Sequence, residues 1–440
     1  MGERPEDRES HWWIARHALA ALLVALVLGH QVAGYGALSS PGALLAELHA
    51  DPADPAARPW GLGEELPYRY RPLFRALTLA VYALLPPSPE TFYGVFVALS
   101  ALSLLLAALS CEWLLRELGY EPPWALGGMA LFLLGFPVLF SHDMPIHTRE
   151  DFLGYACIAL TLVAVARDRP TAVAALGVLG AAVRETCLLG VLPYALVSRR
   201  PRRQVLVAYA FPGASWLLLR VVRGAGQPRY DYLGVSLQPT LERPAEALLY
   251  LFACFGCLWI AAGWRLLAQD TPARHPLLSR RSVGLCFLAT AATGWTLGMV
   301  REARITYILF PFVIPLALDA FASERVRRMA RSPWPWLAGI GVLGAGASGL
   351  LWLASDPDRS LPALRALFGE SFHFGVAQRV LAEFGGEQVL VEQAWASPLN
   401  GPWVLLHLAA SVFLLVGLFA TRGAPRDAPA SGPSDSPADP

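Results

Sequence analysis

A short charged turn between two apolar segments is the first place in this sequence where side chains could do chemistry. Arg301-Glu302-Ala303-Arg304 separates residues 283–300 from residues 305–322, and each apolar run is long enough to form a membrane-spanning helix. Charge at a membrane boundary is costly unless it meets lipid headgroups, water or a partner, so such a cluster is by default a candidate functional site. The alternative is a polar turn that only joins two hairpin helices.

Ionisable residues also gather just before an apolar run that begins at Phe152. The segment 141–151 contains His142, Asp143, His147, Glu150 and Asp151. Imidazole and carboxylate groups ligate divalent metals, but this spacing matches no compact metal motif. Thr148 can instead cap the helix that follows, with Asp151 three residues later. Under either interpretation, Glu150 or Asp151 supplies a carboxylate able to act as a general base.

Arginines interrupt apolar sequence at two further places. Arg69 and Arg71 alternate with tyrosines immediately before residues 72–86. Arginine forms bidentate, charge-assisted hydrogen bonds with phosphate, so this pair suits a lipid phosphate, although arginine and tyrosine are also common interfacial anchors. Arg184-Glu185 interrupts residues 171–197. These two side chains either pair with neighbouring charges or line a cavity that holds an anionic ligand.

The elements that must position these residues are membrane-spanning helices. Of 440 residues, 55% are hydrophobic and 16% are charged, and apolar runs recur from end to end. This composition predicts an all-α, polytopic membrane protein rather than a soluble globular chain. No basic stripe with interleaved aromatic residues occurs, so no nucleic-acid partner is expected. The six cysteines lie in or beside apolar runs, which favours ordinary membrane cysteines over a disulfide or metal site.

The distribution of arginine predicts which loops face the cytoplasm. By the positive-inside rule the strongest arginine clusters are cytoplasmic. They lie at residues 198–203, 274–281 and 325–331, and residues 167–169 are expected to join them. An even number of crossings then separates residues 169 and 198, so residues 171–197 are predicted to form a hairpin of two short helices with Arg184-Glu185 at its outer tip. The same parity argument places the short run 72–86 outside as a juxtamembrane helix.

The expected architecture has about eleven transmembrane helices, with a juxtamembrane helix and short hairpin helices in addition. The chain would lie in the plasma (inner) membrane, with both termini cytoplasmic. Its predicted parts are a leader (1–17), a transmembrane core (18–322) with outer loops at 34–71 and 141–151, C-terminal spans (323–421) with an outer loop at 355–403, and a disordered tail (422–440). The outer face then carries the 301–304 turn, the acidic end of 141–151 and the 184–185 tip together.

This order of elements resembles the GT-C superfamily of multi-spanning glycosyltransferases, which includes protein mannosyltransferases and lipid A aminoarabinose transferases. The resemblance covers roughly residues 14–325. It is carried by Glu150-Asp151-Phe152 opening a helix that closes at Arg167, by the basic tip at Arg184, and by Arg304 followed by Tyr307, Pro311 and Pro315. One departure concerns the acidic residue that the family generally carries soon after the first span, because the first carboxylate here is Glu47, followed by Asp51.

The resemblance implies transfer of a sugar from a polyprenyl-phosphate-linked donor to an extracytoplasmic acceptor. It implies that the base is Asp151 first, or else Glu150, Glu47 or Asp51. The lipid phosphate of the donor would be held by Arg301 and Arg304, with Arg184, Arg71 and Arg69 as further candidates, and Tyr307 would bond that phosphate or brace an arginine. No cofactor is required, and a divalent metal is left open. Besides the sugar donor, membrane lipid is the expected partner.

Two other classes of protein are compatible with the same features. A transporter or flippase for an anionic lipid would also place arginines in a cavity, although no internal repeat of the kind common in transporters is seen. A non-catalytic GT-C-like membrane protein would account for the missing early carboxylate.

Overall fold

Helices dominate the part of the protein that the computed structural model describes. That part comprises residues 5–34, 71–140, 150–224, 241, 244–268, 272–295, 303–355, 380–384, 387–391 and 400–420. One antiparallel hairpin joins β1 (Val380–Phe384) to β2 (Glu387–Val391), with Leu381 opposite Leu390. Apart from this hairpin, the regular elements of the described residues are helices, so the prediction of a helical fold is confirmed.

Within the described residues, four helices contain segments long and apolar enough to cross a membrane. They are α1 (Pro5–Gly34), α4 (Pro89–Glu117), α10 (Arg202–Gly224) and α20 (Asn400–Ala420). A fifth span is present if α12 (Pro244–Phe255) and α13 (Leu258–Leu267), which meet at an angle of 80°, are counted as one broken span. These helix lengths therefore support four or five membrane spans among the described residues, and the total of about eleven spans stays a prediction.

The remaining elements are mostly shorter. They are α3 (Pro72–Tyr82), α5 (Pro122–Leu133), α6 (Phe136–Leu139), α7 (Glu150–Ala166), α8 (Pro170–Val183), the 3₁₀ helix η4 (Glu185–Gly190), α9 (Tyr194–Val197), the 3₁₀ helix η6 (Pro276–Leu278), α14 (Arg280–Thr290), the π turn η7 (Ala291–Trp295), α15 (Ala303–Tyr307), α16 (Phe310–Phe321), α17 (Glu324–Arg331) and α18 (Pro333–Ser355). The 11 residues of α3 cover about 16 Å, too little to cross a bilayer, as predicted for a juxtamembrane helix.

The predicted hairpin between residues 171 and 197 is confirmed. Tyr194 Oη and Ser198 Oγ donate hydrogen bonds to Asp168 Oδ1 at 3.1 and 2.7 Å, so the chain returns to the end from which α8 started. Its tip is Arg184, where an extended backbone ends α8. The returning arm differs from the expected short helix, because it is η4, a turn and α9. Pro193 lacks an N–H and cannot continue a helical hydrogen-bond ladder through this arm.

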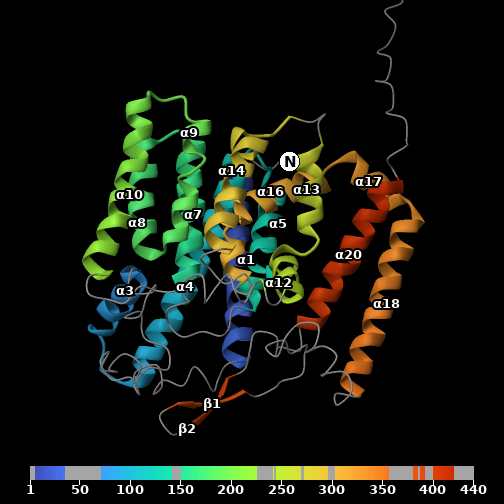
Figure 1. Ribbon diagram of the computed structural model, residues 1–440, viewed down its shortest axis with the longest axis horizontal. Helices are drawn as coiled ribbons and strands as arrows, with labels where there is room; N and C mark the ends of the chain where they lie inside the picture. Colours follow the sequence, from blue (N-terminus) through green and yellow to red (C-terminus); the bar gives the residue numbers. More distant parts are fainter. Residues whose placement is uncertain are drawn as a thin grey trace, which may run out of the picture.

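The arginine-bearing turns at residues 167–169, 198–201 and 272–280 share one end of the helix bundle with the turn at residues 117–121. We call this end the arginine-rich end. Arg167 pairs with Glu117, and Arg274 donates a hydrogen bond to the carbonyl of Gly119. Figure 1 shows α9 and α17 at this end and the β-hairpin at the other. The sequence prediction that these clusters share a side agrees with this arrangement, whereas the membrane face they meet stays a prediction.

Tyr307 lies in an aromatic cluster at the centre of the bundle. Its ring stacks on Phe132 and Phe255 at centroid distances of 5.8 and 5.0 Å, and its hydroxyl donates a 2.5 Å hydrogen bond to the carbonyl of Phe132. The chain passes close to this ring at Gly135, between α5 and α6. A Cβ atom at position 135 would lie 2.2 Å from Tyr307 Oη, so only glycine allows this approach.

Replacing Gly135 with alanine is therefore expected to destabilise the protein by about 1–3 kcal/mol, the usual cost of overpacking a core. The measurement is the unfolding free energy in detergent micelles. Gly127→Ala, on the preceding helix α5, is the matched control, because a Cβ there meets no atom within 4 Å. Equal stability of the two variants would refute the close packing of Tyr307 against Gly135.

The chain breaks sharply at Gly256, between α12 and α13. Gly256 has a φ of +53°, and a Cβ there would lie 2.2 Å from His407 Nδ1. His407, on α20, accepts a 3.2 Å hydrogen bond from the backbone N–H of Cys257, the first group after the break. A buried helix start needs such an acceptor, so α20 completes the broken pair.

Candidate functional site

Five ionisable side chains from three segments converge at the end of the bundle opposite the arginine-rich end. Arg71 precedes α3, Glu150 and Asp151 open α7, and Arg184-Glu185 forms the hairpin tip. We call these five residues the outer charge network. The sequence singled out every one of them, and the structure joins them in two sets of ion pairs, one around Arg71 and one between Arg184 and Asp151.

Arg71 binds two carboxylates at once. Its Nη1 donates to Glu150 Oε1 at 2.9 Å, while Nε and Nη2 donate to the two oxygens of Glu185 at 2.9 and 2.6 Å. The contact with Glu185 is the bidentate geometry in which a guanidinium matches a carboxylate or a phosphate. The Arg71 residue is only 7% exposed, so these contacts are made away from bulk solvent.

Arg184 pairs with Asp151 through its Nη1 and the Oδ1 atom of the carboxylate. Both residues are buried, at 4% and 2% exposure. A buried charge is tolerated only when a partner compensates for lost hydration, so each of these groups stabilises the position of the other. The sequence left two options for Arg184-Glu185, and pairing with charges on neighbouring segments is the one observed.

Small residues bring the hairpin tip against α7. A Cβ atom at Gly180 would lie 2.7 Å from Cys187 Cβ, and one at Gly154 would lie 3.4 Å from Cys187 Sγ. The tip therefore sits directly on the first turns of α7. Carboxylates are also favoured at that place, because the N-terminal end of a helix carries partial positive charge.

The outer charge network holds three carboxylates and two guanidiniums. Glu150 is the first residue of α7 and precedes its apolar run. Burial raises the pKa of the Glu150 carboxyl to about 7, against the lowering effect of Arg71 and Arg184. A proton on Glu150 near neutral pH would balance the charge of the group. A carboxyl that titrates near neutrality is also suited to general acid–base chemistry.

The stability of the protein is expected to decrease as the pH rises from about 5 to 7. The folded state keeps the Glu150 proton up to about pH 7, whereas the unfolded state releases it near the ordinary value of 4.5. The stability from this proton is thus complete below 4.5 and lost as the pH rises through 7, a change of about 3 kcal/mol. Unfolding free energies in micelles at several pH values measure it.

Glu150→Gln removes the titrating group and should remove this pH dependence. Glu90→Gln, at an exposed position of α4, should retain it. Parallel pH profiles for the wild type and Glu150→Gln would show that Glu150 is not the group responsible.

Several predicted site residues are not placed by the structure. Glu47, Asp51, Arg69 and Arg301 lie outside the described residues, as do His142, Asp143 and His147, and for Arg304 the structure describes only the backbone, within α15. The role of the 301–304 turn as a phosphate site thus stays a prediction. Within the described ranges, no group of three or more His, Cys, Asp or Glu side chains is arranged to hold a metal ion.

Tyr307 does not have the surroundings that the sequence suggested. It is 1% exposed, and its hydroxyl is committed to the carbonyl of Phe132. Its burial and the hydrogen bond to Phe132 give it a packing role in this cluster, and a role toward phosphate or an arginine stays a prediction. The six cysteines are buried and form no disulfide with one another, and Cys254 and Cys257 flank the break at Gly256 rather than lying in one continuous helix.

Sequence reasoning missed a second charged cluster, at the arginine-rich end. Asp319 on α16 pairs with Arg265 at 3.6 Å and with Arg274 at 3.1 Å. The signal was present, since Asp319 is the only carboxylate within the apolar run 305–322. An ionisable residue inside such a run marks a site with a partner.

No protein-family model, curated protein or solved structure matches the chain. The likeness to GT-C enzymes therefore rests on the sequence features described above.

Proposed function

We propose that this protein is an integral membrane glycosyltransferase that transfers a sugar from a polyprenyl-phosphate-linked donor to an acceptor outside the cytoplasm. The observation that carries the proposal is the convergence of Arg71 and Arg184 with three carboxylates at one end of the bundle. Glycosyl transfer to a hydroxyl needs a base for the acceptor and positive charge for the leaving phosphate. The outer charge network contains both kinds of group.

The orientation in the membrane is part of the proposal. By the positive-inside rule, the arginine-rich end faces the cytoplasm of a cell whose plasma (inner) membrane holds the protein. Both termini then lie on the cytoplasmic side, and the outer charge network lies on the other face. A GT-C-like core of about eleven spans would enclose it.

In the proposed reaction, Asp151 removes the proton from the acceptor hydroxyl as its oxygen attacks the anomeric carbon of the sugar. The bond between that carbon and the phosphate oxygen breaks, and polyprenyl phosphate leaves with the electron pair. Arg184 would release Asp151 and pair with the phosphate, because a guanidinium binds either anion in the same geometry. Arg71, Arg301 and Arg304 would add positive charge, and Glu150 is the alternative base.

A second candidate function has a specific observation in its favour. Both arginines of the network are already paired with carboxylates, which is also how a purely structural charge cluster would look. A non-catalytic GT-C-like protein, or a transporter that binds an anionic lipid, would need no carboxylate as a base.

The deciding experiment uses the purified protein in nanodiscs with polyprenyl-phosphate hexose and pentose donors and a membrane extract as the source of acceptor. Native mass spectrometry measures donor binding, and release of polyprenyl phosphate measures transfer. Binding with release supports the glycosyltransferase. Binding without release supports the lipid-binding alternative, and the absence of both overturns the proposal.

A further inference from the structure

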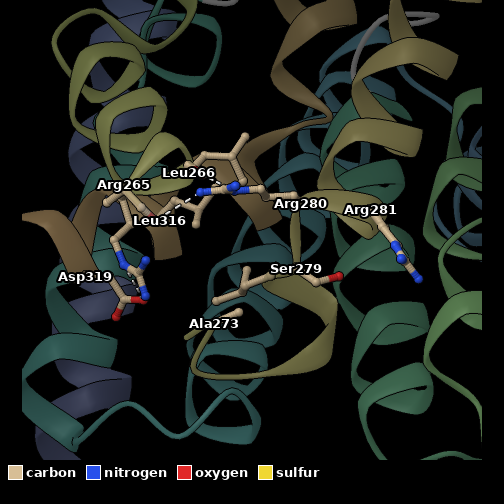
Figure 2. Close-up of a pocket in the computed structure, with 10 residues that line it drawn as sticks. Arg265, Leu266, Ala273, Ser279, Arg280, Arg281, Leu316 and Asp319 are labelled. Atoms are coloured by element: carbon tan, nitrogen blue, oxygen red, sulfur yellow. Dashed lines mark hydrogen bonds and ion pairs between the residues drawn. The ribbon is translucent and has the colours of Figure 1, made fainter. Parts of the chain in front are cut away.

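A cavity of about 350 Å³ lies at the arginine-rich end, between the end of α13 and the start of α14. Arg265, Ser279, Arg280, Arg281 and Asp319 form its polar wall, and leucine and alanine side chains form the rest (Figure 2). This volume falls within the range of small-molecule sites. The outer charge network lies at the opposite end of the bundle, so the cavity is a separate feature.

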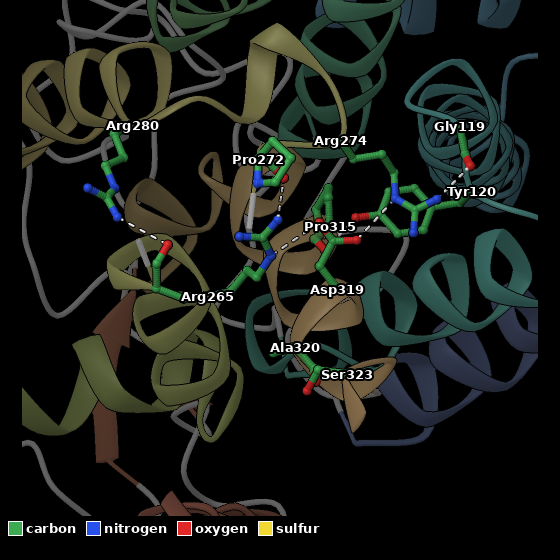
Figure 3. Close-up of polar contacts among 11 residues, drawn as sticks. Gly119, Tyr120, Arg265, Pro272, Arg274, Arg280, Pro315, Asp319, Ala320 and Ser323 are labelled. Carbon is green, nitrogen blue, oxygen red and sulfur yellow. Dashed lines mark hydrogen bonds and ion pairs between the residues drawn. The ribbon is translucent and has the colours of Figure 1, made fainter. Parts of the chain in front are cut away.

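Among the described residues that line the cavity, arginines outnumber carboxylates. Asp319 accepts from Arg274 Nε at 3.1 Å and lies 3.6 Å from Arg265 Nε (Figure 3). Arg265 is only 9% exposed, and its Nη2 also donates to the carbonyl of Pro272 at 2.8 Å. Asp319 is thus shared by two guanidiniums, of which Arg265 lines the cavity.

The opposite wall offers hydrogen-bond donors. Arg280 reaches across to the end of α13, where Nε donates to the Leu266 carbonyl at 2.7 Å and Nη2 to those of Leu267 and Ala268, both at 3.1 Å. Its third nitrogen, Nη1, makes no hydrogen bond within the described residues. Arg281 makes neither an ion pair nor a hydrogen bond through its side chain to the part of the chain that the structure describes. Both guanidiniums thus retain donors.

The first turn of α14 adds backbone donors at the same place. Ser279 caps this 11-residue helix by accepting from the N–H of Ser282 at 3.4 Å. Its first regular backbone bond runs from the N–H of Val283 to the carbonyl of Ser279. The N–H groups of Arg280 and Arg281 precede that bond, and such groups at a helix start favour anions.

We propose that this cavity binds a phosphate group, carried either by an anionic phospholipid headgroup or by a soluble phosphate ester. Arg280 and Arg281 would provide the guanidinium donors and the start of α14 the backbone donors, with Arg265 as the buried positive charge behind them. Phosphate accepts several hydrogen bonds from different directions, which suits this set of donors better than a single ion pair. Basic pockets between transmembrane helices are known to bind lipid headgroups.

The test measures dissociation constants by native mass spectrometry of the whole protein in a neutral detergent. The probes are glycerol phosphate, dioctanoylphosphatidylglycerol and, as the zwitterionic comparison, dioctanoylphosphatidylcholine. Arg281→Gln is the main variant, because the Arg281 side chain forms no hydrogen bond or ion pair with the described part of the chain. We expect it to weaken binding of the phosphate probes roughly tenfold, the loss of one charge-assisted hydrogen bond. Arg280→Gln/Arg281→Gln should weaken binding further.

The matched control is Arg116→Gln/Arg331→Gln, which removes the same charge from exposed positions outside the cavity. Tight binding of phosphatidylglycerol alone supports a lipid headgroup, and equal binding of glycerol phosphate supports a soluble ester. The proposal is overturned if neither probe binds saturably, if phosphatidylcholine binds as tightly as phosphatidylglycerol, or if the control pair weakens binding as much as the cavity variants.

Discussion

Replacing Asp151 with asparagine is expected to slow the release of polyprenyl phosphate roughly 10²- to 10⁴-fold, the usual contribution of a general base. The proposed function gives Asp151 the acceptor proton, and an amide cannot take it. Asparagine has nearly the same shape and can still accept a hydrogen bond from Arg184. Initial rates of donor turnover in nanodiscs, at saturating donor, measure the effect.

A structural explanation for such a loss must be separated from a chemical one. Asp151→Asn leaves Arg184 buried without its counter-charge, so the protein could lose activity by losing its fold. The double variant Asp151→Asn/Arg184→Gln replaces the ion pair by a neutral hydrogen-bonded pair, which removes the unpaired charge. Stability that recovers without transfer identifies Asp151 or Arg184 as chemically required.

The same assay on Glu150→Gln distinguishes the two candidate bases. If Asp151→Asn turns over the donor at the wild-type rate and Glu150→Gln does not, the base is Glu150. If both variants retain full activity, the outer charge network does not supply the base.

Replacing Arg71 with alanine is expected to lower the free energy of unfolding by about 3–5 kcal/mol. Within the described residues, Arg71 donates the side-chain hydrogen bond that Glu150 accepts and two hydrogen bonds to Glu185. Removing it leaves the buried Glu150 carboxyl and the part-buried Glu185 carboxylate without this partner, at the contact between α7 and the hairpin tip. Reversible unfolding of the variant in mixed micelles measures the loss.

The control for this prediction removes the charges together. Arg71→Met combined with Glu150→Gln and Glu185→Gln leaves no unpaired charge, so it should recover most of the lost stability. Arg116→Ala, at an exposed position of α4, should have little effect. A change below about 1 kcal/mol for Arg71→Ala, which is the usual range for exposed ion pairs, would contradict a buried network.

Arginine placement predicted more of this site than any motif did. Counting crossings between residues 169 and 198 required a hairpin, and the hydrogen bonds of Tyr194 and Ser198 to Asp168 bear this out. It also put Arg184 at the same end as Asp151. Parity specifies the end of the bundle, but it does not specify partners. Whether Arg71 meets Glu150 or Glu185 depends on rotations of the helices about their axes, which a pattern of apolar runs does not encode.

The positions of the helix breaks were not predicted either, because they involve contacts between segments far apart in the sequence. Residues 124–140 form one apolar run in the sequence, yet the chain turns at Gly135, where Tyr307 packs closely. Glycines are frequent in membrane helices, so a single glycine does not predict a helix break. The ring that lies against Gly135 comes from a segment far along the chain. The sequence likewise does not show that the carbonyl of Phe132 accepts a hydrogen bond from Tyr307.

The hydrogen bond across the break at Gly256 has a consequence for how the protein is made. His407 follows Cys257 by 150 residues, and its helix is the last one described. While a ribosome is still synthesising the intervening segments, the N–H of Cys257 has no histidine to accept it. Biogenesis of the broken pair is therefore completed only when α20 is inserted. A nascent chain stopped short of residue 400 would present the membrane quality-control machinery with an unfinished helix.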